Sequence, residues 1–197
     1  MQFKSVEAYL EALKQDPSLA MIPLGMVAEW KGISRSAVAD QIKTGRLEGM
    51  AVKGRRKTWR GVTPKALFAQ AEAVESGQRE QRRLVLRVLS KAAAEGRLIT
   101  YGEVMAPVGM APSNPRHRAA IGNLLSDLSR DSLQRHGFLL SAIVVQKGSR
   151  RPNAQFFTLA RELGSQPDGE EPDAFWRGQC DKVFASFRVT TPTEIAE

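Results

Sequence analysis

Residues 23–60 constrain the fold of this chain more than any other stretch, because they combine helical spacing with residues that end and begin helices. Met26, Val27 and Trp30 have helical spacing and predict a first short helix. Gly32 then allows a sharp turn, because glycine adopts backbone angles that other residues resist. The chain is therefore expected to leave this helix through a tight turn.

A second short helix is predicted directly after that turn. Ser34 suits the N-cap position, because its hydroxyl can accept a hydrogen bond from a free amide of the first turn. Val38 and Ile42, four residues apart, give the helix one buried stripe, and Gly45 ends it. At about 100° per residue, the start and the far side of this helix expose Arg35, Ser36, Ala39, Asp40 and Lys43.

A β-hairpin is predicted to follow the two helices. Residues 47–52 alternate as a strand, residues 53–56 supply a glycine and three cations for the tip, and residues 57–62 return as the partner strand. The Thr-Pro pair at 63–64 then begins another helix, with threonine as the cap and proline at the first helical position. Trp59 is expected to lie in the core beneath the hairpin.

The order helix, turn, helix, hairpin, helix over about residues 21–72 resembles the winged helix-turn-helix of the excisionase and MerR-like regulators. The resemblance implies that the second helix enters the major groove of DNA, where arginine can bind guanine and alanine can contact a thymine methyl. The exposed residues of that helix are then the candidates for base contacts. The cations of the hairpin are the candidates for phosphate or minor-groove contacts: Lys53, Arg55, Arg56, Lys57 and Arg60. The alternative is a small helical core that binds no DNA.

The charge of the chain favours an anionic partner. The sequence carries a net charge of +8 and has a pI near 10.0. Residues 31–60 hold nine Lys or Arg against two acids, a net charge of +7, whereas residues 161–197 hold four against eight, a net charge of −4. The basic excess coincides with the two helices and the hairpin, which favours double-stranded DNA as the partner.

Several classes of protein are not expected from this composition. No apolar run approaches the roughly 18 residues of a membrane-spanning helix. The amphipathic, acid-bearing start lacks the features of a signal peptide. The single cysteine, Cys180, excludes an intramolecular disulfide and a cysteine-rich zinc site. A cytoplasmic protein without cofactor or metal is therefore expected.

The fold class expected is mainly α with small β wings, in the form of two tandem winged helix-turn-helix-like domains. An N-terminal helix within residues 1–20 precedes the first domain, at residues 21–76. Residues 64–75 and 78–95 are both predicted to be helical. The Ser-Gly pair at 76–77 is expected to break or kink the chain at the domain boundary.

The second domain, at residues 77–163, repeats an order of helix, loop, helix and strand. A helix is expected to open after the Thr-Tyr-Gly of 100–102, and the Asn-Pro pair at 114–115 caps and begins the next one. Residues 139–145 form a continuous apolar run that predicts a buried strand. The basic loop 147–151 after it is interpreted as a second wing.

Three segments of this half, ITYGEV, RAAIGNLL and SAIVVQKG, resemble the DNA-binding domain of the O6-alkylguanine-DNA alkyltransferases and alkyltransferase-like proteins, over about residues 84–148. The resemblance implies that Tyr101 helps to rotate a nucleotide out of the duplex and that Arg118 fills the gap. Ser141 stands where the family has its reactive cysteine. The Pro-Cys-His-Arg motif is therefore absent, and no alkyl transfer is expected. The other DNA-contact candidates of this half are Arg116, Lys147, Arg150 and Arg151.

The C-terminal part, residues 164–197, is expected to hold a polar linker and an amphipathic helix at 174–187. The aromatic stripe of this helix is typical of a core or a subunit interface. A homodimer through the second half or through this helix is therefore one expectation. The residues after Arg188 are expected to be disordered.

The sequence favours a non-enzymatic, sequence-specific DNA-binding protein, such as a transcriptional regulator or a phage or plasmid accessory factor. One alternative is a lesion-sensing, base-flipping protein of the alkyltransferase-like type. Another is an architectural protein that bends DNA without reading its sequence. An enzyme such as a nuclease ranks lowest, because the basic segments hold no acids with metal-binding spacing.

Overall fold

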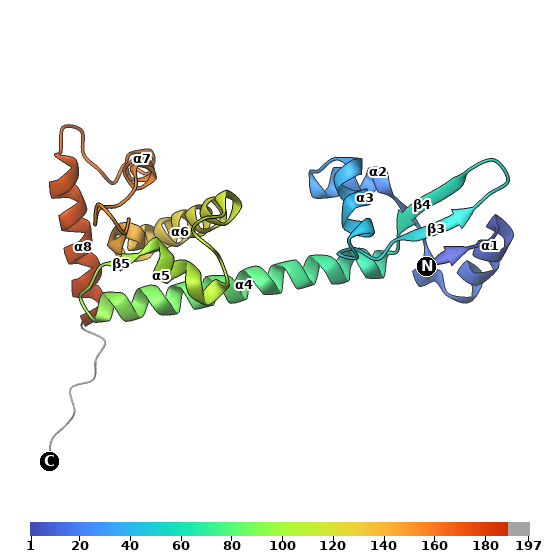
Figure 1. Ribbon diagram of the computed structural model, residues 1–197, viewed down its shortest axis with the longest axis horizontal. Coiled ribbons are helices and arrows are strands. Elements are labelled where there is room, and N and C mark those ends of the chain that lie inside the picture. The colour runs from blue at the N-terminus through green and yellow to red at the C-terminus, as the bar shows by residue number, and fades with distance from the viewer. Residues whose placement is uncertain (189–197) are drawn as a thin grey trace, which may run out of the picture. The chain divides into compact units, whose positions relative to one another are not determined.

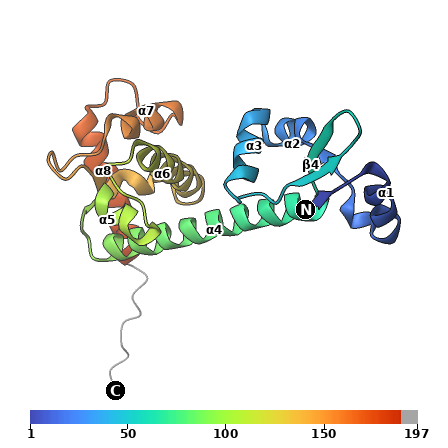
Figure 2. The ribbon, with the colours of Figure 1, turned by 45° about the vertical axis from the view of Figure 1, so that its right-hand side comes forward.

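The structure, a computed structural model, describes residues 1–188. It divides into two compact units, of which the first is Met1–Gln78 and the second begins at Arg79. The first unit thus includes the N-terminal residues that were expected to precede it. Both units consist mainly of helices with a few short strands (Figures 1 and 2), so the prediction of a mainly α fold is confirmed.

The first unit contains a four-stranded sheet with the strand order β1-β3-β4-β2. Its strands are β1 (Gln2–Phe3), β2 (Ile22–Pro23), β3 (Met50–Lys53) and β4 (Thr58–Val62). β3 and β4 form the predicted antiparallel hairpin, with Val52 opposite Trp59 and Ala51 opposite Arg60. β1 pairs in parallel with β3, and β2 pairs antiparallel with β4. These two outer strands have two residues each, too few for an alternation pattern, and the sequence did not predict them.

The helices before and between the strands of the first unit include the two that the sequence predicts around Gly32. They are α1 (Val6–Gln15), the 3₁₀ helix η1 (Pro17–Leu19), α2 (Leu24–Lys31) and α3 (Arg35–Lys43). α2 ends at Gly32, whose φ of 64° is left-handed and therefore favours glycine. Ser34 caps α3, since its hydroxyl accepts a hydrogen bond from the amide of Ala37. The tight turn and both helices are therefore where the sequence predicted them.

The core of the first unit is small. Its buried members are Val27, Ala28, Val38, Leu47, Val62 and Leu67. Of the three residues whose spacing predicted α2, only Val27 belongs to it, because Met26 and Trp30 are 62% and 57% exposed. The prediction that Trp59 lies in the core is wrong. The indole is 49% exposed, and the ammonium of Lys57 lies 3.4 Å from the centre of its ring.

One uninterrupted helix, α4 (Pro64–Ala94), follows the hairpin. Thr63 caps it as predicted, accepting a hydrogen bond from the amide of Ala66 at 3.1 Å. The break expected at residues 76–77 does not occur. A single glycine costs a helix only about 1 kcal/mol relative to alanine, and the surrounding residues are mostly good helix formers. α4 supplies Leu67 to the first core and Val85 and Leu89 to the second.

Up to Arg188, the second unit continues from α4 with short strands and four more α-helices. Its elements are β5 (Ile99–Thr100), α5 (Tyr101–Met105), η2 (Ala106–Val108), α6 (Pro115–His136), η3 (Leu140–Ile143), β6 (Val144–Val145), α7 (Ala154–Glu162) and α8 (Pro172–Arg188). Thr100 and Glu103 form a reciprocal capping box at α5. Asn114 caps α6, in agreement with the prediction.

The strand predicted at 139–145 is mostly wrong, although every residue of it is buried. Residues Leu140–Ile143 form a turn of 3₁₀ helix, and only Val144–Val145 is extended, pairing in parallel with β5. A 3₁₀ turn buried on all sides leaves the same apolar run in the sequence as a buried strand. Loop 147–151 closes on itself, with the amide of Gln146 donating to the carbonyl of Arg151 at 2.8 Å. In the structure as described it is a closed loop, not the tip of a hairpin.

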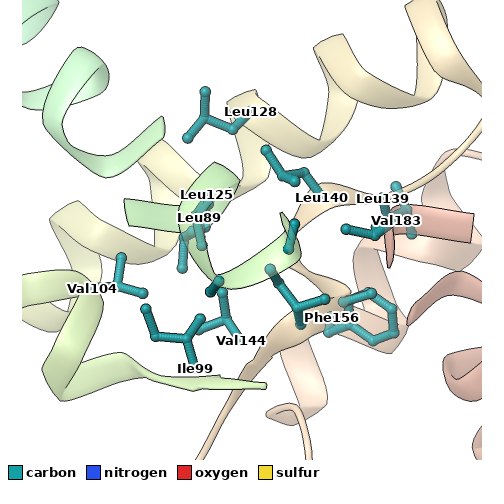
Figure 3. Close-up of a cluster of buried hydrophobic side chains, with 14 of the residues drawn as sticks. Leu89, Ile99, Val104, Leu125, Leu128, Leu139, Leu140, Val144, Phe156 and Val183 are labelled. Carbon is teal, nitrogen blue, oxygen red and sulfur yellow. The ribbon is translucent and has the colours of Figure 1, made fainter. Parts of the chain in front are cut away.

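The core of the second unit is larger and draws on α4, α5, α6, η3, α7 and α8 (Figure 3). From its apolar spacing, the helix that begins at Asn114-Pro115 is predicted to turn Ala120, Ile121, Leu124, Leu125 and Leu128 inward. Ile121, Leu125 and Leu128 are buried in this core and Leu124 packs against it partly buried, but Ala120 is exposed. α8 presents Phe175 and Val183 to the same core, and its other aromatic residues pack against it partly buried. The aromatic stripe of α8 is therefore used within its own unit. The predicted tail after Arg188 lies outside the described residues.

Candidate nucleic-acid interface

α3 exposes the five residues predicted to contact bases. Arg35, Ser36, Ala39, Asp40 and Lys43 all lie on the surface, while Val38 on the opposite side is fully buried. The helix is therefore held from one side and free on the other. This is the condition for a helix that presents side chains to a groove of a duplex.

Polar side chains lock α3 to its neighbours on the inner side. The ammonium of Lys31, at the end of α2, donates to Gln41 Oε1 of α3 at 3.1 Å and to the side-chain carbonyl of Gln70 of α4. Gln70 also donates to the backbone carbonyl of Arg46 at 2.5 Å. Burial lowers the pKa of Lys31. These bonds tie α2, α3 and α4 together, so the orientation of α3 is fixed by more than its small apolar contact.

Arg35 packs over the beginning of α2. A Cβ added at Gly25 would lie 2.5 Å from a terminal guanidinium nitrogen of Arg35. The absence of a side chain at Gly25 thus makes room for the arginine. This contact holds a guanidinium at the exposed start of α3, where the sequence had predicted a base contact.

The hairpin carries its five predicted cations on the surface. Arg55 and Arg56 occupy the tip, which is closed by a hydrogen bond from the amide of Gly54 to the carbonyl of Lys57 at 2.8 Å. Lys53 and Arg60 lie on the strands. Lys57 differs from the others, because its ammonium covers the ring of Trp59.

α3 and the hairpin share a hollow of about 700 Å³. From α3 it is lined by Ala39, Asp40 and Lys43, and from the hairpin by Lys53, Thr58 and Arg60. Five predicted site residues are therefore brought together here. The other five, Arg35, Ser36, Arg55, Arg56 and Lys57, lie outside this hollow.

The N-terminal segment adds a residue that the sequence analysis missed. Because β1 pairs with the edge of β3, Lys4 also lines the hollow. The hollow thus holds the cations Lys4, Lys43, Lys53 and Arg60 and one acid, Asp40. No sequence signal could have placed Lys4 here, because the strand that carries the chain to β3 is only two residues long.

The second unit has a separate pocket of about 580 Å³. It brings together Tyr101 and Arg118, the two residues assigned by resemblance, with the predicted cation Lys147. Burial raises the pKa of Tyr101 to about 12, and a side-chain hydrogen bond with Asn153 acts in the opposite direction. Arg118 is held in place by donating from Nη1 to the carbonyl of Pro112 at 2.8 Å.

Polar and small residues complete the wall of that pocket. The amides of Gln146, Asn153 and Gln155 line it, and Gly102 and Gly122 contribute no side chains. Gly102, Gly122 and Gln146 belong to the three segments that carry the resemblance, but nothing in the sequence assigned these five residues to a pocket, because amides and glycines are common on any surface. Together they offer hydrogen-bond donors and acceptors around an open space, a chemistry that suits a flat polar ring such as a nucleobase.

The remaining predicted cations differ in their freedom to bind a ligand. Arg116 lies exposed in the first turn of α6, and Lys147 and Arg150 are exposed beside β6. Arg151 forms an ion pair with Asp173 of α8. The loop is thereby anchored to α8, and the carboxylate of Asp173 offsets part of the positive charge of Arg151.

Ser141, at the position of the family's reactive cysteine, and Cys180, the single cysteine, are both buried. Ser141 is buried and bonded to Ser129, whose hydroxyl donates to it at 2.7 Å, and it does not line the pocket of Tyr101. Burial raises the pKa of the Cys180 thiol to about 12, and the thiol donates to the carbonyl of Ala142. A reactive thiol needs the opposite shift.

The histidines are also engaged in structural contacts. Nδ1 of His117 accepts a hydrogen bond from the amide of Ala111 at 2.9 Å, and His136 stacks on Phe138. Over residues 1–188, no three His, Cys, Asp or Glu side chains gather as metal ligands.

The chain was compared with protein-family models, with curated proteins and with solved structures, and no match was found. The two family resemblances drawn from the sequence therefore stay predictions. None of the helices within the described range is both long and apolar enough to span a membrane.

Proposed function

We propose that this chain is a non-enzymatic, sequence-specific protein that binds double-stranded DNA through its first unit, as a transcriptional regulator or a phage or plasmid accessory factor. The observation that carries the proposal is the hollow shared by α3 and the hairpin. Four cations and a single carboxylate line it, and α3 is exposed along the side that faces away from the core.

The residues divide naturally between reading bases and holding phosphates. Arg35 and Lys43 can donate to guanine, Ala39 can contact a thymine methyl, and Asp40 can accept from the amino group of cytosine. The hairpin cations can bind phosphates, which gives affinity on every sequence but no preference among them. A protein that has both base-contacting and phosphate-binding residues binds every duplex and has the highest affinity for one sequence.

The test is selection from a pool of random duplexes at physiological salt, followed by sequencing. One enriched motif is the expected result, and Arg35→Ala or Lys43→Ala should weaken binding to that motif by roughly 1–3 kcal/mol without weakening nonspecific binding as much. Binding without enrichment would instead indicate an architectural protein. A chain that binds no duplex would contradict the proposal.

A second candidate function is supported by the pocket of the second unit. Tyr101, Arg118 and Lys147 line one cavity with three amides. This set favours a base-flipping, lesion-sensing protein of the alkyltransferase-like type, which binds a damaged nucleotide without turning it over. The buried state of Ser141 and Cys180 favours binding over reaction.

This second function predicts tighter binding to a duplex with a modified guanine than to the same intact duplex. Tyr101→Ala should remove that difference, and Arg56→Ala in the hairpin should lower both affinities equally. Equal affinity of the original protein for the two duplexes would eliminate this candidate and leave the first one standing.

A further inference from the structure

Three large apolar side chains lie exposed together on the first unit. Met26 and Trp30 are four residues apart on α2, so they project from the same side of that helix. Phe68, on the first turns of α4, meets Trp30 edge to face, with 6.3 Å between the ring centres. The three side chains are 57–62% exposed. We call Met26, Trp30 and Phe68 the aromatic patch.

The aromatic patch is distinct from the candidate DNA surface. None of its three residues lines the hollow between α3 and the hairpin. Its rim also differs in charge, since Glu29, Lys65 and Glu72 surround it on α2 and α4, whereas residues 31–60 carry a net charge of +7. A mixed rim around exposed aromatic rings is typical of a protein interface and unlike a phosphate-binding surface.

We propose that the aromatic patch docks on the same patch of a second copy of this chain, bound at a neighbouring site on the same duplex. The proposal rests on the proposed DNA-binding function of the first unit. A contact between two identical copies has a two-fold axis, so each patch must complement itself.

The order of charges along α4 meets that requirement. Lys65 lies three residues before Phe68 and Glu72 four residues after it, which places both on the side of the helix that carries Phe68. A two-fold axis that passes near Phe68 and is perpendicular to α4 relates two antiparallel α4 helices. Lys65 of each copy then lies beside Glu72 of the other. The basic surface of residues 31–60 cannot pair with itself in this way.

The size of the aromatic patch explains why a neighbouring DNA site is needed. Three large side chains, each more than half exposed, offer on the order of 400 Å² per copy. This is about half of the roughly 800 Å² that each partner of a stable complex buries. Such a contact is weak between free molecules and becomes effective when DNA holds two copies close together.

The experiment uses the full chain and duplexes with one or two copies of the site recovered by selection, at spacings varied through one helical turn. At the best spacing the original protein should fill two sites with about tenfold cooperativity, within the usual range of coupling between sites. Phe68→Glu should abolish the cooperativity and keep the single-site affinity. Val74→Glu is the matched control, because Val74 is an exposed apolar residue of the same helix outside the patch.

A charge exchange tests whether the partner is a second copy. Lys65→Glu should weaken cooperativity by placing two acids together, and Lys65→Glu with Glu72→Lys should restore it. Restoration is expected only if both charges belong to the same kind of chain. Independent filling of the two sites at every spacing would overturn the proposal and leave another protein as the occupant of the patch.

Sedimentation of the protein alone at high concentration distinguishes a failure of DNA binding from a failure of the contact between two aromatic patches. If no duplex is bound, the proposed function fails. A weak dimer that Phe68→Glu removes and Val74→Glu retains would still support the contact. A monomer at every concentration, together with no duplex binding, would overturn it.

Discussion

Removal of Arg56 from the hairpin tip should lower affinity for every duplex by an amount that depends on salt. Arg56 is exposed at the tip and has no ion pair or hydrogen bond within the part of the chain described. It can therefore bind a phosphate without giving up another contact. Each phosphate neutralised contributes about 0.9 to the slope of log affinity against log salt. Arg56→Ala should thus cost about fivefold at 0.15 M salt and about fifteenfold at 0.05 M.

Lys57 gives a comparison within the same turn. Its ammonium lies over Trp59, at 3.4 Å from the ring centre. A cation–π contact at an exposed site is worth about 0.5–1 kcal/mol. If Lys57 gives up this contact in order to bind a phosphate, its contribution to DNA affinity is reduced by roughly two- to fivefold. Lys57→Ala should therefore weaken binding less than Arg56→Ala does.

The assay is fluorescence anisotropy with one labelled duplex at several salt concentrations. Lys14→Ala is the control, because Lys14 is an exposed cation of α1 in the same unit, paired with Glu11. This variant changes the net charge equally without touching the hairpin. An unchanged salt slope in Arg56→Ala, or an equal loss in Lys14→Ala, would refute the assignment of the tip to phosphate binding.

Three further results are expected. Gly25→Ala should displace the guanidinium of Arg35 and weaken binding to the selected site by up to about 1–3 kcal/mol, which is the loss expected for Arg35→Ala. The thermal unfolding midpoint of the variant should stay within a few degrees of the original. Cys180 should resist alkylation at about pH 8 in the folded protein and react after denaturation, because its raised pKa keeps the thiol protonated; rapid labelling of the folded protein would contradict this. Leu89→Ala should lower the free energy of unfolding by about 2–5 kcal/mol, measured by chemical denaturation, because Leu89 is fully buried in the second core.

Local chemistry made the elements of the first unit predictable. Gly32 and Ser34 act within one turn of the chain, so their effect on α2 and α3 can be read without knowing the rest of the fold. The hairpin was predictable for the same reason. The exposed residues of α3 could be predicted from the burial of Val38, because once one side of a helix is known to face the core, the opposite side must face solvent.

Most of the errors arose where residues distant in the sequence decide the structure. The eight residues of α2 include apolar side chains on more than one side of the helix. Which of them is buried depends on where α3 and α4 pack, and in the structure Val27 is buried and Trp30 is not. The break or kink predicted at residues 76–77 is an error of a local kind, because the helix-forming residues on either side outweigh the small cost of one glycine. The position of Lys4 beside the hollow depends on a strand pairing across some fifty residues of sequence.

The continuity of α4 has a consequence for how the protein unfolds. The helix has 31 residues and contributes to both cores. The nucleation of a helix is its costly step, and extension adds turns at little cost. Once the larger core of the second unit has ordered Val85 and Leu89, the turn that carries Leu67 can form by extension of the same helix. We therefore expect the smaller core to draw part of its cooperativity from the larger one. Hydrogen exchange along α4 should be slowest near Val85 and Leu89, faster near Leu67 and fastest in the exposed residues 72–80 between them.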